Sequence, residues 1–186
     1  MAAREVLAER GASRLTTREV AERAKVSEGS LFYHYNDRVG LLAAVIQDGL
    51  TNVGAARTGE AEGADLRAIL EGFTRTVEGF LDQSLIVMIT AQSDAQLRAT
   101  LASHLVRNDM GPHRGIRALG ARLRRGQEEG IVRRDVDPDS VAVLVYSSCF
   151  ERVAQRQMIS EEYGADLPNR EDLVTTMCTL LAPPAG

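Results

Sequence analysis

The chain has 186 residues, of which 44% are hydrophobic and 26% charged, and its formal net charge is −4. This length suits one sizeable domain or two small ones. Because no run of about 18 apolar residues is present, and charged residues interrupt the N-terminus, we expect no membrane span and no signal peptide. Two cysteines are too few for a secreted disulfide framework, so we expect a cytoplasmic protein.

The first predicted helix spans residues 2–10, with Val6 and Leu7 facing inward. The second helix begins with a capping-box pattern, in which Thr16 and Glu19 each satisfy a backbone N–H of the other. A tight turn at 24–26 then leads to the third helix.

The turn and the third helix complete a helix-turn-helix pattern. We expect Val26 in the turn to be buried, Ser27 to cap the third helix, and Leu31 and Phe32 to face inward. Asp37 is the expected cap of a fourth helix with a buried apolar side. Such an arrangement places one helix in the major groove of DNA.

The remaining sequence predicts further helices and no strands. Residues 54–64 are small and polar and indicate a linker. Asp65 caps a long helix, and the last two helices are expected at 138–158 and 170–181. We therefore expect an all-α fold of about nine helices, with a three-helix DNA-binding head at residues 1–48 and a helical body for ligand binding and dimerisation at residues 49–186.

Three segments of the head resemble the DNA-binding domain of the tetracycline-repressor (TetR) family: residues 11–21, 26–35 and 37–42. They cover about the first quarter of the chain, and the rest resembles the family only in length and helical pattern. The resemblance implies a two-domain, dimeric, ligand-responsive transcriptional regulator.

The head departs from the family pattern at three places. Phe32 stands where the family often has a tyrosine, and Lys25 stands where glycine is common. If Lys25 has a positive φ, it costs on the order of 1 kcal/mol there. Met1 lies almost inside the first helix, so we expect either no arm in the minor groove or a sequence that begins late.

The residues expected to contact DNA lie at the start of the second helix, in the turn, on the outer face of the third helix and at the start of the fourth. They are Thr17, Arg18, Lys25, Ser27, Gly29, Ser30, Tyr33, His34 and Arg38. Arg18 and Ser30 are expected to read bases, and His34 and Arg38 to anchor phosphates. Positive and negative side chains of residues 1–50 cancel, so binding depends on charge placement. A solvated surface arginine is the alternative for Arg18.

An apolar stripe in the body either lines a cavity for an apolar or weakly polar effector or forms an ordinary packed core. Its members are Phe73, Val77, Phe80, Met88, Gln92, Ile116, Leu119, Tyr146 and Phe150.

The last two helices are unusually apolar for surface elements. We expect them to pair with the same helices of a second subunit as a four-helix interface. The expected interface residues are Leu144, Val145, Leu173, Met177 and Leu180. Packing against the chain's own core is the alternative. Cys149 and Cys178 lie in these helices and are expected to act as small buried hydrophobes.

Taken together, these patterns favour a homodimeric repressor that binds a double-stranded DNA operator and is released from it by a small molecule. We expect no enzyme activity, no cofactor and no metal, since His104 and His113 fit no ligand spacing. Two alternatives remain: an architectural DNA-binding protein with no effector, and a small-molecule carrier or enzyme with a vestigial head.

Overall fold

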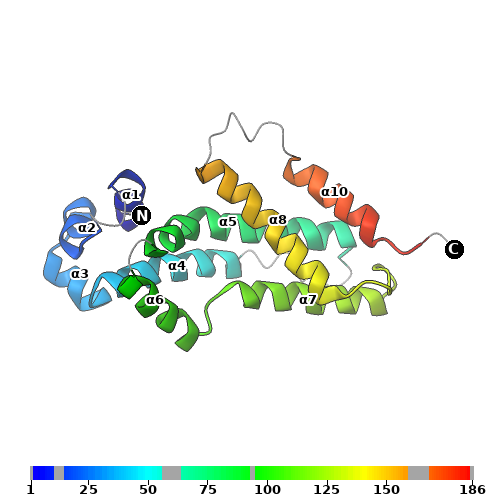
Figure 1. Cartoon of the computed structure of the whole chain (residues 1–186), viewed down its shortest axis with the longest axis horizontal. Helices are drawn as coiled ribbons and strands as arrows, with labels where there is room; N and C mark the ends of the chain where they lie inside the picture. The colour runs from blue at the N-terminus through cyan, green and yellow to red at the C-terminus, as the bar shows by residue number, and fades with distance from the viewer. Residues whose placement is uncertain (1, 11–14, 56–63, 93–94, 159–167, 185–186) are drawn as a thin grey trace. The chain divides into compact units, whose positions relative to one another are not determined.

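The computed structural model describes residues 2–10, 15–55, 64–92, 95–158 and 168–184. Within these ranges every regular element is a helix (Figure 1), which confirms the all-α class. The helices are α1 (Ala2–Arg10), α2 (Thr17–Ala24), α3 (Glu28–Tyr35), α4 (Arg38–Ala55), α5 (Leu66–Gln92), α6 (Ala95–Arg107), α7 (Pro112–Glu128), α8 (Pro138–Met158) and α10 (Arg170–Leu181). None of the described helices is both long and apolar enough to cross a membrane.

The chain forms two compact units. One unit contains Met1–Asn52 and Phe80–Gly111, and the other contains Val53–Gly79 and Pro112–Gly186. Helix α5 therefore contributes its first half to the second unit and its second half to the first.

Side-chain caps start the helices of the head, as the sequence predicts. The Thr16 hydroxyl accepts from the Glu19 N–H at 3.1 Å, and the Ser27 hydroxyl accepts from the Ser30 N–H at 3.1 Å. At the start of α4, Asp37 accepts from a backbone N–H at 2.8 Å. Each cap satisfies a donor that the first turn of a helix leaves without a helical partner.

The turn between α2 and α3 corrects two predictions. Lys25 ends α2 in the left-handed conformation, with φ 56°. Val26 was expected to be buried but is 47% exposed, because the turn closes on its backbone N–H, which donates to Ala21. Phe32 was expected to face inward and is 58% exposed. Consecutive helical residues point about 100° apart, and Leu31 takes the buried position.

Buried apolar side chains lie on α1, α2, α3 and the start of α4. The fully buried residues in this part of the chain include Val6, Leu15 and Leu42. On the surface, Arg23 of α2 forms ion pairs with Glu9 at 2.5 Å and Glu5 at 3.4 Å of α1. These pairs fix the first helix against the second.

In the second unit, the first half of α5 packs with α7, α8 and α10. Helices α7 and α8 approach closely at Gly120, where a Cβ would lie 2.2 Å from the Asp139 carboxylate. The buried core consists of Leu66, Ile69, Leu70, Leu119, Leu123, Val132, Ala142, Val145, Val174 and Leu181.

Residues 54–64 were expected to be a linker, but α4 continues to Ala55, and 56–63 lie outside the described residues. Helix α5 continues past the buried Ser84, whose hydroxyl donates to the Phe80 carbonyl at 2.8 Å within the same helix.

Candidate nucleic-acid interface and effector region

The outer face of α3 presents polar and aromatic side chains to solvent. Gly29, Ser30, Tyr33 and His34 are all exposed, as the sequence predicts. The rings of Tyr33 and His34 meet edge to face, with centroids 5.4 Å apart. A Cβ added at Gly29 would meet no atom within 4 Å, so the space in front of this residue is open to a partner.

Beside α3, two helix N-termini border one open hollow of about 310 Å³. It lies at the starts of α2 and α4 and is lined by Leu15, Thr16, Thr17, Phe32, Asn36, Asp37 and Arg38. Backbone N–H groups and the dipole at a helix N-terminus favour anions. The half-buried Arg38 at its edge adds a positive charge, and the carboxylate of Asp37, which caps α4, adds a negative one.

Two of the predicted DNA contacts are engaged by carboxylates within the protein. The Thr17 hydroxyl donates to Glu28 Oε1 at 2.9 Å, and Arg18 Nε donates to Glu22 Oε1 at 3.1 Å. Lys25 and Ser27 are exposed in the turn. The predicted residues of the head therefore surround α3, and Glu28, to which the sequence assigned no role, lies among them.

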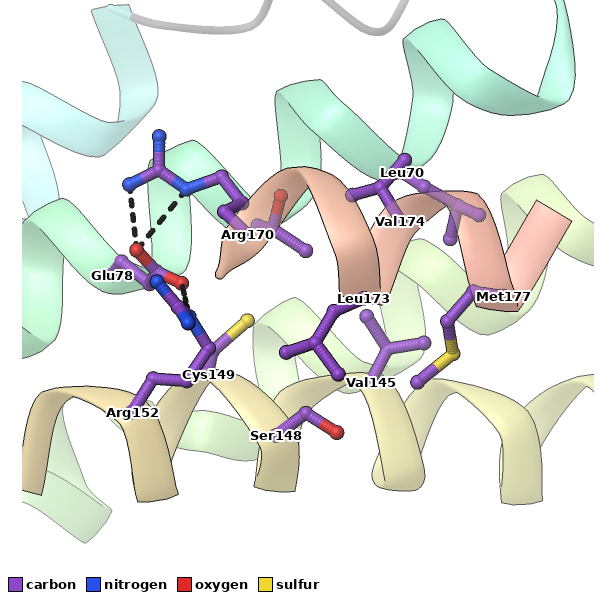
Figure 2. A pocket seen from close by; sticks show the side chains of 11 residues that line it. Leu70, Glu78, Val145, Ser148, Cys149, Arg152, Arg170, Leu173, Val174 and Met177 are labelled. Carbon is purple, nitrogen blue, oxygen red and sulfur yellow. Dashed lines mark hydrogen bonds and ion pairs between the residues drawn. The ribbon is translucent and has the colours of Figure 1, made fainter. Parts of the chain in front are cut away.

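In the second unit a small cavity lies between α5, α8 and α10 (Figure 2). Its volume is about 10 Å³, room for about one water molecule. It is lined by Leu70, Thr74, Glu78, Val145, Ser148, Cys149, Arg152, Arg170, Leu173, Val174 and Met177. None of the residues predicted to bind ligand lines this cavity.

A buried ion-pair cluster closes one end of the cavity. Glu78 is 1% exposed, and its two carboxylate oxygens accept from Arg152 Nε at 2.9 Å and Arg170 Nη2 at 2.6 Å (Figure 2). Arg156 Nη1 lies 3.9 Å from Glu78 Oε2. Burial raises the pKa of Glu78, but the hydrogen bonds and charges of Arg170 and Arg152 outweigh it, so the pKa lies below its ordinary value.

Sequence reasoning missed this cluster, although one signal was available. Glu78 lies on α5 directly after the buried Val77 and two residues before the buried Phe80. A carboxylate within a buried stripe needs a cation as partner. The sequence does not say which of the chain's arginines supplies it.

The residues predicted to line a ligand cavity have different environments. Val77, Phe80 and Leu119 are buried, and Phe73 and Ile116 are partly buried against the core. Tyr146 is half-buried, and burial raises its pKa to about 12. Met88 is half-buried, whereas Gln92 and Phe150 are exposed. The cavity of α5, α8 and α10 differs from this apolar stripe, since its polar end is the Glu78 cluster.

The predicted dimer residues also divide into groups. Leu144 and Leu180 are 62% and 60% exposed, and Leu173 and Met177 are half-buried. Val145 is 1% exposed and belongs to the chain's own core, so its assignment to a dimer surface is wrong. Cys149 is buried, as expected, while Cys178 is only half-buried.

Comparison with known proteins assigns the chain to a family. Residues 1–45 match the family model described as "Bacterial regulatory proteins, tetR family", and residues 75–177 match "Tetracyclin repressor-like, C-terminal domain". The HTH-type transcriptional repressor KstR2 of Rhodococcus jostii is 26% identical over 141 residues, which cover 71% of this chain and 65% of that protein. The match thus spans less than two thirds of this relative.

Solved structures show the same fold at low sequence identity. Salmonella enterica GusR superposes with a TM-score of 0.68 at 21% identity, covering 97% of this chain and 91% of that chain. The ketosteroid transcriptional regulator KstR2 of Mycobacterium tuberculosis superposes with a TM-score of 0.65 at 20% identity, again covering 97% and 91%. With family matches over both the helix-turn-helix and the larger helical part, this chain belongs to the tetR family of bacterial regulatory proteins.

Proposed function

We propose that this protein is a homodimeric transcriptional repressor that binds a near-palindromic DNA operator and leaves it when a small molecule binds the body. The observation that carries the proposal is the exposed face of α3 beside a hollow bordered by two helix N-termini and Arg38. The division of labour is a head at residues 1–48 and a ligand-binding and dimerisation body at 49–186.

In the proposed complex α3 enters the major groove, and the residues of the head divide into phosphate contacts and base contacts. His34, near the C-terminus of α3, and Arg38, at the start of α4, hold phosphates, supported by Lys25, Ser27 and Tyr33. Arg18 and Ser30 contact base edges, and Gly29 permits close approach. Because the chain carries a net charge of −4, affinity depends on these few placed contacts.

A second subunit supplies the second head. Leu144 on α8 and Leu180 on α10 are exposed, and Leu173 and Met177 expose part of their side chains. Symmetric pairing of α8 and α10 would bury all four. The two recognition helices would then lie about 34–36 Å apart, one turn of B-DNA.

Effector release requires a ligand that distinguishes two conformers. A hundredfold preference supplies about 2.7 kcal/mol per site. Pockets for drug-sized ligands have volumes of roughly 300–1,000 Å³, whereas the cavity beside Glu78 has a volume of about 10 Å³. The effector, which we propose to be small and largely apolar, therefore binds a more open arrangement of the apolar stripe in the body.

That small cavity favours a second candidate function, an architectural DNA-binding protein with no effector. Selection of bound fragments from genomic DNA by the full chain, repeated with a panel of metabolites, separates the two. A repressor enriches inverted-repeat sites and loses them with at least one metabolite. Retention with every metabolite supports the architectural alternative, and enrichment of no sequence contradicts both.

A further inference from the structure

Glu28 is the first residue of the proposed recognition helix, and its side chain is exposed. Its neighbours on the outer face, Gly29 and Ser30, carry no charge. Glu28 thus brings a negative charge to the end of α3 that contacts base edges when a helix-turn-helix docks. A carboxylate there faces two rows of phosphates, and this repulsion needs a compensating contact.

The position of the carboxylate is set by a contact within the head. The Thr17 hydroxyl of α2 donates to Glu28 Oε1 at 2.9 Å. A carboxylate offers about four lone-pair sites, so one hydrogen bond leaves acceptor capacity for a partner on DNA. The N-terminus of α3 also favours the negative charge. The carboxylate is therefore held in place and still able to accept.

The chemistry of the major groove limits what such an acceptor can contact. Guanine presents two acceptors there, and thymine presents an acceptor and a methyl group. Only cytosine N4 and adenine N6 donate, and adenine places the N7 acceptor beside its donor. A carboxylate close to N7 is repelled, whereas cytosine offers its amino group without an adjacent acceptor on the same base.

We propose that Glu28 selects a cytosine in each operator half-site by accepting a hydrogen bond from its N4 amino group, with Thr17 as the positioning residue. The proposal rests on the proposed function, since it requires α3 to enter the major groove. It adds an acidic specificity residue to a head whose other predicted contacts are cationic or neutral.

Selection from a random DNA library tests the proposal with the full chain and two variants, Glu28→Ala and Glu28→Gln. Wild type should enrich cytosine at one position per half-site, on the order of tenfold over other bases. Glu28→Ala should lose that preference and keep the others. Glu28→Gln should move the preference to adenine, because a glutamine amide pairs with adenine N6 and N7.

Affinity for unrelated DNA gives a readout that a purely structural role would not produce. Glu28→Ala removes a charge that phosphates repel, so its non-specific affinity should rise severalfold at low salt. If Glu28 only supports the helix, the variant would instead bind all DNA more weakly. Glu128→Gln, an exposed glutamate on α7, is the matched control and should leave both readouts unchanged.

The outcomes separate this inference from the proposed function. If wild type enriches sites and Glu28→Ala enriches the same bases, Glu28 is not a base contact, and the repressor proposal stands. A wild-type preference for adenine that disappears in Glu28→Ala would overturn the cytosine assignment. If wild type enriches no sequence, both proposals fall.

Discussion

The head and the helical body are stabilised by contacts of very different sequence separation. In the head, Thr17 and Glu28 are 11 residues apart, and Arg23 and Glu9 are 14 apart. In the body, Glu78 bonds to Arg152 and Arg170, which lie 74 and 92 residues further along the chain. The surface contacts of the head therefore form between residues that are close in the sequence. The buried contacts of the body form only when three helices that are distant in the sequence pack together. We therefore expect substitutions in the head to change DNA binding locally, and substitutions in the body to change the stability or assembly of the whole fold.

The largest effect should come from charges placed on the proposed dimer surface. In Leu144→Glu with Leu180→Glu, carboxylates replace two exposed leucines, and burying them between subunits would cost several kcal/mol. We expect a monomer that retains its helix content and loses operator binding. Light scattering and circular dichroism measure both properties.

The matched control for this double variant is Val106→Glu, a similarly exposed apolar residue on α6. It should leave the oligomeric state unchanged. A double variant that remains dimeric would move the interface away from α8 and α10, and a monomeric wild type at micromolar concentration would remove the dimer proposal.

A second substitution tests the interior of the body. Glu78→Gln takes the charge from a buried carboxylate and leaves Arg152 and Arg170 without a counter-ion. Removing one partner of a buried pair costs about 3–5 kcal/mol, and we expect the low end because Arg170 is partly solvated. Urea unfolding should show the loss. Glu71→Gln on the same helix breaks a surface pair with Arg67 and should cost no more than about 0.5 kcal/mol.

The same carboxylate predicts a pH dependence. The pKa of Glu78 is lowered in the folded protein from 4.5, so the ionised form stabilises the fold above that pH. The contribution is lost as the pH falls below 4.5 and through the folded pKa. The difference in unfolding free energy between wild type and Glu78→Gln should therefore be constant near neutral pH and shrink in acid. A difference that is constant down to pH 3 would contradict the role of the charge.

In the head, Arg38→Ala tests the proposed phosphate contact. Loss of one phosphate contact lowers affinity for every sequence and reduces the slope of log affinity against log salt by about one. Titrations at several salt concentrations measure the slope, and Arg117→Ala, an exposed arginine on α7, is the control. An unchanged slope in a folded variant would place Arg38 outside the interface.

The smallest expected effect concerns the backbone at Lys25. Its φ of 56° is unfavourable for a side chain with a Cβ and costs nothing for glycine. Lys25→Gly should stabilise the head by about 1 kcal/mol, whereas Lys25→Ala should not. Both variants lose the positive charge of Lys25, so both should bind DNA more weakly if Lys25 contacts the phosphate backbone of the DNA. Equal thermal stability of the two variants would show that the positive φ at residue 25 does not destabilise the head.

Local sequence patterns predicted the head well, because each helix cap is a hydrogen bond between a side chain and the backbone N–H three residues later. Thr16, Ser27 and Asp37 cap helices as expected, and the limits of α8 and α10 agree with the proline and asparagine that precede or begin them. The errors at Val26 and Phe32 arose because hydrophobicity alone suggested burial, whereas Val26 lies in the turn and Leu31, not Phe32, takes the inward position on α3.

The interior of the body could not be derived in the same way. Hydrophobic spacing shows which residues share a face of a helix, but not which neighbouring helix covers that face. For this reason Leu119 was assigned to a ligand cavity and Val145 to a dimer surface, although both side chains are buried in the core. The partners of Glu78 depend on how α8 and α10 pack across α5, which no local pattern specifies.

The separation of Glu78 from Arg170 also has a consequence for synthesis on the ribosome. At about 5–20 residues per second, the separation of 92 positions means that Arg170 is synthesised roughly 5 to 20 seconds after Glu78. Residues 1–48 have all been synthesised before that interval begins. During it, the Glu78 carboxylate stays hydrated, because the arginines that allow its burial are not yet part of the chain.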